Sequence, residues 1–370
     1  MSKILIMGGT GHTGRLIARQ LLKHSDAAVT IATRHIDKAE AFANELNQEH
    51  AGLRADAMYA NAADAVSLQT AFRDHTLVVI AAPTTGLAET VVCAALEAGV
   101  DYLDVQLSAR KLAVLQTLAG EIEQAGRCFI TEAGFHPGLP SALVRYAAAN
   151  LDTIESAVTV GYLNMGKDLP YAESVDEVIE TFKDYQAQVY KDRQWTKPGS
   201  FGMRKIDFGS DIGWKRCYSM FFEELRPLPE TYPSLKEVSF YISESHWVTD
   251  WVIMPIVWIG LKIMPHATRR MGKLLWWGMG TFHKPPYRVE LQVQACGFKD
   301  GQKANFQASV AHPDGYALTA IPVVATLLQY LDNSARKPGL WMMGHFAEPI
   351  RLMRDMEKLG LRFSSSIQYG

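Results

Sequence analysis

The stretch Lys3-Ile-Leu-Ile-Met-Gly8-Gly9-Thr10-Gly11-His12-Thr13-Gly14 decides the fold of the first part of the chain. An apolar run of strand length passes through a glycine cluster directly into helix-forming residues, and Gly9, Gly11 and Gly14 have G-x-G-x-x-G spacing. This context predicts a dinucleotide-binding turn, although a tight turn without a ligand is the alternative. We assign the turn itself to Gly9, close approach of a pyrophosphate to Gly11 and close packing of the helix to Gly14. The candidate pyrophosphate site is the backbone of Gly8, Gly9, Thr10, Gly11, His12, Thr13 and Gly14.

The second predicted strand, residues 28–33, ends at Thr33 and is followed by Arg34. About twenty residues after the last glycine, a site for NAD has an acidic residue that binds the ribose 2′-hydroxyl. Arginine at this place instead suits a 2′-phosphate, which a guanidinium can bind with two hydrogen bonds. Thr33 and Arg34 therefore favour NADP over NAD, although Arg34 could also be a solvated cation at a strand end.

The composition excludes several classes of protein. The chain has 370 residues, enough for two domains, and a formal net charge of −2 that gives no general attraction for nucleic acid. Its four cysteines lack the spacing of a metal site, so we expect no metal and reduced thiols. The first strand follows the first residues directly, which leaves no room for a signal peptide, and we expect a cytoplasmic protein.

Alternating apolar strands and helical stretches over residues 1–138 predict a Rossmann domain with a parallel sheet. The strand over residues 76–82 is apolar throughout, as the centre of such a sheet requires. It ends at Ala82 and Pro83, where small residues would let a nicotinamide or ribose approach, although a plain turn explains Pro83 equally well.

Three features together resemble the saccharopine dehydrogenase family and its oxidoreductase-like members. They are the glycine motif with Arg34, the segment Gly99-Val-Asp-Tyr-Leu-Asp-Val105 and the loop Gly134-Phe-His-Pro-Gly-Leu139. The lysine-pathway reductases of this family carry an aspartate where this sequence has His136. The resemblance implies an NADP-dependent oxidoreductase whose second domain has a mixed sheet, holds a small-molecule substrate and forms a homodimer.

The remaining chain predicts an α+β domain over residues 139–310, followed by C-terminal helices over 311–370 that fold back on the cleft. Within residues 246–280 lie five of the eight tryptophans, with Arg269, Arg270 and Lys273 beside them. The uncharged run is too short for a membrane-spanning helix, which needs ~20 residues. Two interpretations remain open: packing in the core or a dimer interface, and contact with a lipid-like substrate or the inner face of a membrane.

Catalytic candidates are expected where strands and loops end at the sheet edge that faces the cleft. His136 comes first, because imidazole titrates near neutral pH and its glycine-flanked loop could expose it to the substrate. Tyr102 and Glu132 are further candidates. The predicted activity is hydride transfer to or from a C=N, C=O or C=C bond of a small or hydrophobic substrate. The alternative function is a membrane-associated or lipid-associated NADP-binding protein without turnover.

Overall fold

The computed structural model describes residues 1–50, 52–165, 171, 174–181, 186–199, 202–209, 211–264, 266–285 and 287–370. It divides into two compact units. The first contains Met1–Gly138 and Thr319–Gly360, and the second contains Leu139–Leu318 and Leu361–Gly370. The division at residue 138 coincides with the boundary expected from the sequence, whereas the tail is shared between both units.

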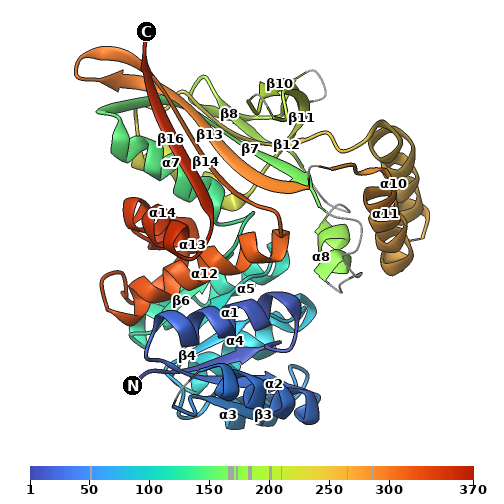
Figure 1. Cartoon of the computed structure of the whole chain (residues 1–370), viewed down its shortest axis with the longest axis vertical. Helices are drawn as coiled ribbons and strands as arrows, with labels where there is room; N and C mark the ends of the chain where they lie inside the picture. Colours follow the sequence, from blue (N-terminus) through green and yellow to red (C-terminus); the bar gives the residue numbers. More distant parts are fainter. Residues whose placement is uncertain are drawn as a thin grey trace. The chain divides into compact units, whose positions relative to one another are not determined.

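The first unit is built on a parallel sheet of seven strands, which confirms the predicted Rossmann class (Figure 1). In sheet order the strands are β15 (Gly339–Met342), β6 (Cys128–Thr131), β5 (Asp101–Asp104), β4 (Leu77–Ile80), β1 (Lys3–Met7), β2 (Ala28–Thr33) and β3 (Ala55–Tyr59). The side chains of β4 are fully buried, because helices cover both faces of such a sheet.

Helices connect these strands and pack on the sheet (Figure 1). They are α1 (His12–His24), α2 (Ile36–Glu49), α3 (Ala65–Phe72), α4 (Ala88–Glu97), α5 (Ala109–Thr117) and α6 (Ala119–Gln124), with α12 (Gly315–Leu331), α13 (Met343–Phe346) and α14 (Pro349–Lys358) from the tail. The helical stretch between residues 109 and 124 is interrupted at Leu118, which caps the end of α5 and the start of α6.

The second unit contains the mixed sheet that was predicted for it. In sheet order its main strands are β10 (Met203–Asp207), β11 (Trp214–Met220), β12 (Glu237–Ser243), β7 (Thr153–Asn164), β13 (Arg288–Lys299), β14 (Gln302–His312) and β16 (Arg362–Tyr369), with β8 (Val189–Lys191) and β9 (Gln194–Thr196) off this path. The pair β12 and β7 is parallel, and the other neighbours are antiparallel. Its helices are α7 (Leu139–Asn150), α8 (Ser174–Thr181), α9 (Leu228–Thr231), α10 (Met254–Ile263) and α11 (Thr268–Phe282).

Residues 311–370 contain the expected helices and, in addition, two strands that the sequence analysis did not identify. β15 adds a seventh strand beside β6, and β16 pairs with β14 at the edge of the other sheet. β15 is only four residues long, and most side chains of β16 are exposed, so neither segment has the alternating hydrophobic pattern that identifies a strand in a sequence.

A buried carboxylate attaches the tail to the first unit. The Asp101 carboxylate accepts hydrogen bonds from the Tyr330 hydroxyl at 2.7 Å, from Arg336 Nε at 2.9 Å and from the backbone N–H of Cys128 at 3.0 Å. Removal of one donor would leave the buried carboxylate partly unsatisfied, which lowers the free energy of unfolding. Asp101 thereby links α12 and the loop before β15 to β5 and β6.

We expect Tyr330→Phe to lower the free energy of unfolding by about 1–3 kcal/mol, because it removes one donor from a buried carboxylate. Urea denaturation measures the change. Tyr369→Phe is the matched control, since the exposed Tyr369 hydroxyl makes only a 3.5 Å hydrogen bond to Asp300. Equal effects of the two substitutions would show that the Asp101 junction does not stabilise the fold.

Candidate functional site

The turn after β1 depends on two glycines that contact each other. Gly8 has a φ of +82°, and a Cβ at this residue would lie 2.7 Å from the carbonyl oxygen of Ala81. A Cβ at Gly14 would lie 2.4 Å from the carbonyl oxygen of Gly8, so α1 packs on the turn as predicted. The left-handed conformation of this turn lies at Gly8, whereas the sequence analysis assigned the turn to Gly9, where a Cβ would lie 3.0 Å from the Ile6 carbonyl oxygen.

Gly11 differs from these glycines, because its own protein surroundings leave space for a side chain. The contact found for a Cβ at Gly11 is the Gly8 carbonyl oxygen at 3.3 Å, which a small shift would relieve. Gly11 also caps α1 without any side-chain hydrogen bond to the helix N-terminus. The turn therefore has a surface that a pyrophosphate can approach closely, and the helix N-terminus favours an anion there.

Arg34 follows β2, the strand beside β1. Its side chain is exposed, and it forms no hydrogen bond or ion pair with any other residue that the structure describes. The hydroxyl of Thr33 accepts a hydrogen bond from the backbone N–H of His35 at 3.3 Å. A cation without a partner, next to a turn shaped for a pyrophosphate, fits the additional phosphate of NADP.

The turn after β4 is fixed by a residue that the sequence analysis did not select. Gln106 Nε2 donates hydrogen bonds to the Ala82 carbonyl oxygen at 2.6 Å and to Thr84 Oγ1 at 2.9 Å. It thereby holds Ala82 and the adjacent Pro83 at the carboxyl edge of the sheet, beside the glycine turn. Sequence reasoning missed Gln106 because nothing in the sequence shows that it reaches another strand end.

A buried ion pair holds the ends of β5 and β6 together. Lys111 Nζ donates to Asp104 Oδ1 and to the Gln106 carbonyl oxygen, each at 2.6 Å, and both side chains of the ion pair are 0% exposed. Thr131 Oγ1 donates to Asp104 Oδ2 at 2.7 Å. Hydrogen bonds to both partners compensate for the burial of this ion pair. Its loss would release the strand ends that carry the candidate catalytic loop.

Tyr102 belongs to this buried scaffold. It is 1% exposed, its ring stacks on Phe129 with centroids 5.2 Å apart, and burial together with Asp104 raises its pKa well above the ordinary value. The structure thus places this candidate in the core and beside Asp104. A residue so placed can position the edge of the sheet, whereas it cannot touch a substrate.

The loop after β6 brings Glu132 and His136 to the same edge. Glu132 is buried, has a φ of +54°, and its backbone N–H donates to Asp104 Oδ1 at 3.3 Å. Gly138 shapes the loop, since a Cβ there would lie 2.8 Å from the Glu132 carbonyl oxygen. The His136 ring is half-buried and lies against Phe135, with centroids 4.2 Å apart.

His136 does not titrate near neutral pH, contrary to the reason for which it was selected. Desolvation lowers the pKa of His136 to about 4, because its surroundings disfavour the charged imidazolium. The imidazole is therefore neutral at pH 7. Sequence analysis could not foresee this, because the shift comes from tertiary burial.

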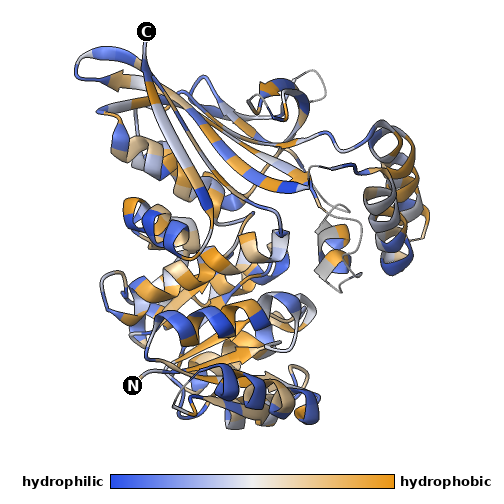
Figure 2. Ribbon diagram, in the orientation of Figure 1, coloured by the Kyte–Doolittle hydropathy of each residue, from blue (hydrophilic) through white to orange (hydrophobic). Residues whose placement is uncertain are grey.

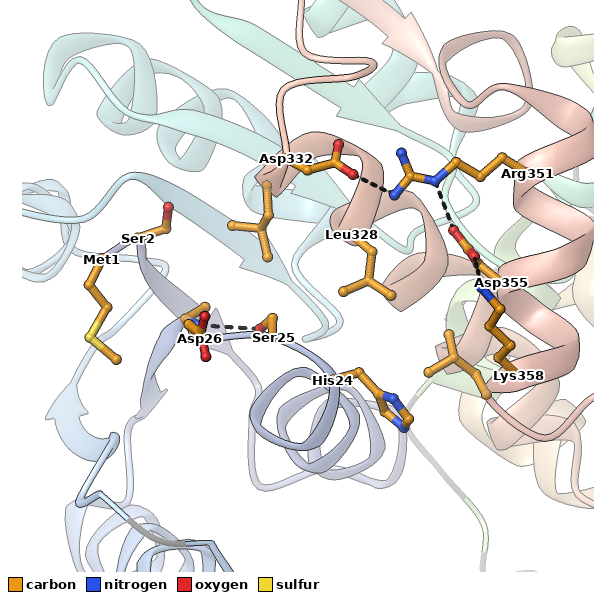
Figure 3. A pocket seen from close by; sticks show the side chains of 13 residues that line it. Met1, Ser2, His24, Ser25, Asp26, Leu328, Asp332, Arg351, Asp355 and Lys358 are labelled. Atoms are coloured by element: carbon orange, nitrogen blue, oxygen red, sulfur yellow. Dashed lines mark hydrogen bonds and ion pairs between the residues drawn. The ribbon is translucent and has the colours of Figure 1, made fainter.

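A separate pocket of about 510 Å³ lies at the opposite end of the strands, between α1, α12 and α14 (Figure 3). Figure 3 shows Arg351 between Asp332 and Asp355. Arg351 Nη2 lies 2.5 Å from Asp332 Oδ2, and Arg351 Nε lies 3.0 Å from Asp355 Oδ2. Lys358 also pairs with Asp355. Because its cations already have carboxylate partners, this pocket is less suited to a dinucleotide phosphate than the glycine turn with Arg34.

The turn, the parallel sheet and the unpaired arginine define a dinucleotide-binding domain of the NADP type. Residues 4–129 match the family model of the saccharopine dehydrogenase NADP binding domain. The chain therefore carries the NADP-binding domain of the saccharopine dehydrogenase family, which confirms the predicted family and cofactor. The family model does not extend to the second unit.

Two curated relatives show more distant similarity. Carboxynorspermidine synthase from Vibrio cholerae is 27% identical over 255 residues, covering 63% of this chain and 61% of the relative. Carboxyaminopropylagmatine dehydrogenase from Synechocystis is 24% identical over 255 residues, covering 66% of this chain and 63% of the relative. The chain thus spans about three-fifths of the length of the curated relatives it matches. The second relative is named a dehydrogenase, which agrees with the prediction of an oxidoreductase.

The fold has a counterpart among solved structures. Saccharopine dehydrogenase (L-Glu forming) from Saccharomyces cerevisiae, in its apo form, matches with a TM-score of 0.71, a sequence identity of 14% and coverage of 100% of both chains. This identity supports a shared fold. It confirms the combination of a Rossmann unit with a second unit that contains a mixed sheet.

We expect Gly11→Ala to fold normally and to lose affinity for NADP, because its Cβ fills space that a pyrophosphate needs. Gly14→Ala should instead lower the thermal midpoint of unfolding, because its Cβ collides with the protein backbone. Gly120→Ala in α6 is the control, since a Cβ there meets no atom within 4 Å. Calorimetric NADP titration and thermal denaturation distinguish the three variants. Unchanged NADP affinity in Gly11→Ala would contradict the assignment of this turn.

The lowered pKa of His136 predicts a pH-dependent stability. The pKa of His136 is about 4 in the folded protein and about 6.5 in an unfolded chain, so the unfolded state binds more protons between these values. The neutral, buried His136 therefore has its full effect on the free energy of unfolding above pH 6.5, and this effect is lost as the pH falls towards 4. At pH 5 the loss is about 2 kcal/mol.

His136→Gln should therefore flatten the decline in stability between pH 7 and pH 5, whereas His266→Gln, at an exposed histidine, should leave it as in the parent. Urea denaturation at both pH values measures this difference. An identical decline in the parent and in His136→Gln would show that His136 is not held neutral by burial.

Proposed function

We propose that this protein is an NADP-dependent oxidoreductase that transfers a hydride to or from a carbon–nitrogen double bond of a small-molecule substrate. The observation that carries the proposal is the exposed Arg34 without a partner, one strand away from a glycine turn with space at Gly11. These residues fit NADP. When bound, NADP supplies or accepts the hydride. The protein therefore has to bind the cofactor and the substrate, orient them towards each other and exclude water.

The proposed cofactor contacts follow the carboxyl edge of the sheet. The backbone from Gly8 to Gly14 faces the pyrophosphate, and Arg34 with Thr33 binds the 2′-phosphate. Ala82 and Pro83 face the ribose and nicotinamide half, where Gln106 keeps their turn in place. The buried pair of Asp104 and Lys111 lies at the end of β5, and Asp104 also binds Thr131 at the end of β6, where the loop with His136 begins.

The state of His136 favours a C=N substrate over a C=O substrate. With a pKa of about 4, roughly one imidazole in a thousand is protonated at pH 7, so His136 is a poor proton donor. A carbonyl group needs a proton as it becomes an alcohol, whereas a protonated imine already carries its proton before hydride arrives. We propose that neutral His136 orients the substrate nitrogen by hydrogen bonding. Glu132 and Tyr102 support its loop and the strand beneath it.

The relatives favour the same substrate class. Carboxynorspermidine and carboxyaminopropylagmatine are both named as carboxyl-bearing amines. A compound of this class forms when an amine condenses with a carbonyl compound and the resulting imine is reduced. For this chain we propose an amine, or the carbonyl compound that condenses with it, as the substrate class.

A second candidate function is an NADP-binding protein at a membrane surface without turnover. Four exposed tryptophans within residues 247–277 of the second unit favour it. Incubation with NADPH, a panel of amines and a panel of carbonyl acids separates the two functions. An enzyme oxidises NADPH only when both panels are present, and it forms a product whose mass equals that of the reduced imine. A protein without turnover binds NADPH and forms no product.

We expect Arg34→Ala to remove most of the preference for NADPH over NADH, which should be about 1–3 kcal/mol in the parent, the range for hydrogen bonds to a charged group. Calorimetric titration with both nucleotides measures the preference. Arg73→Ala, another exposed arginine of the first unit, should preserve it. A parent protein that binds both nucleotides equally would refute the role of Arg34.

A further inference from the structure

Two helices of the second unit carry an apolar face that the described part of this chain leaves exposed. The hairpin consists of a π-helical segment (Thr249–Ile253), α10 and α11. We define the Trp face by six side chains that are between 55% and 73% exposed: Trp247, Trp251, Trp258, Ile259, Ile263 and Trp277. Of the interpretations left open by the sequence, packing in the core of the chain does not apply to these four tryptophans.

The hairpin has its own core on the opposite side. Ile253, Val257 and Leu261 are buried and pack with Met271 and other side chains of α11 and with Ile179 of α8. Since these apolar contacts already hold the helices together, the Trp face is not needed to fold the hairpin. Figure 2 shows hydrophobic residues along α10 and hydrophilic residues where α11 begins.

Contacts between residues before and after the hairpin join its two ends. The Ser245 backbone N–H donates to Asp250 Oδ2 at 3.0 Å, and Ser245 Oγ lies 2.6 Å from His283 Nε2. The ring of His246 stacks on Phe282, with centroids 5.1 Å apart. The Trp face is thus presented by a packed element between β12 and β13.

The charges of this hairpin have one sign where they are exposed. Among the described residues from 247 to 284, the exposed charged side chains are those of Lys262, Arg269, Arg270, Lys273 and Lys284. The acidic residue within this range, Asp250, is half-buried and accepts the hydrogen bond from Ser245. On neighbouring α8, Asp176 accepts from Tyr171 and Glu180 accepts from Thr268. Arg269, Lys273 and Trp277 share one stripe of α11, because they are four residues apart.

We propose that the Trp face lies on the surface of an anionic lipid bilayer. Tryptophan favours the membrane interface, because its ring is apolar while its N–H remains hydrated, and adjacent cations are attracted to anionic headgroups. The arrangement fits contact with one leaflet: α10 has 10 residues and α11 has 15, against the ~20 of a spanning helix. No helix in the described ranges is long and apolar enough to cross a bilayer.

Charge argues against a second copy of the chain as the occupant of this face. In a two-fold symmetric dimer the same patch meets itself, so the cations around the Trp face would approach the cations of the partner. An anionic surface complements the same charges. The homodimer expected from the family resemblance would then have to use another surface.

Sedimentation of the full chain with vesicles tests the proposal. We expect binding to vesicles of phosphatidylglycerol and phosphatidylcholine at low salt, weaker binding at high salt, and little binding to pure phosphatidylcholine. Arg269→Ala with Arg270→Ala should weaken binding roughly 25-fold, about fivefold per cation. Trp251→Ala with Trp258→Ala should abolish it.

Matched controls distinguish vesicle binding by the Trp face from nonspecific adsorption. Trp214→Ala removes a tryptophan that is 68% exposed on β11, and Lys197→Ala with Lys205→Ala removes two exposed cations, yet both variants should bind as the parent does. Circular dichroism and thermal denaturation, compared with the parent, show whether each variant is folded. The proposal is overturned by absence of vesicle binding at low salt, by equal losses in the controls, or by a dimer that dissociates in the hairpin variants without any vesicle binding.

Discussion

The close approach between α1 and the turn after β1 is the constraint on which the first unit depends. At Gly14 a single Cβ would lie 2.4 Å from the Gly8 carbonyl oxygen, and at Gly8 it would meet the Ala81 carbonyl oxygen. Three backbone segments therefore meet without side chains between them. This contact directs the N-terminus of α1 towards the space beside Gly11, and the parallel pairing of β1 with β2 brings Arg34 to the same edge. The proposed phosphate contacts rest on these positions, since the helix N-terminus favours an anion.

The electrostatics of this edge depend on which charges are already paired. Asp104 and Lys111 neutralise each other inside the protein, and Asp101 is paired with Arg336. Arg34 keeps its positive charge available to a ligand. Desolvation keeps His136 neutral, so the loop after β6 contributes a hydrogen-bonding group without a net charge at pH 7. In the proposed function, the cation binds the cofactor phosphate and the neutral His136 contacts a substrate that carries its own charge.

Local sequence predicted most of the first unit. The run of apolar residues into Gly8, and the position of Arg34 after β2, predicted the turn, the sheet and the choice of NADP. The roles of Gln106 and Lys111 could not be predicted, because they arise from contacts between strand ends that are distant in sequence. The strands β15 and β16 were missed because one is short and the other is mostly exposed. The composition of the Trp-rich segment indicated an unusual surface, whereas only the packing of α10 on α11 shows which tryptophans are exposed.

The central claim is that NADP binds along the carboxyl edge of the sheet with its 2′-phosphate on Arg34. A crystal structure of the full chain with NADP tests it most directly. We predict that the pyrophosphate lies against Gly11 at the N-terminus of α1, with Arg34 within hydrogen-bonding distance of the 2′-phosphate. A nucleotide bound in the pocket beside His24 and Arg351, or a 2′-phosphate that does not contact Arg34, would contradict the account.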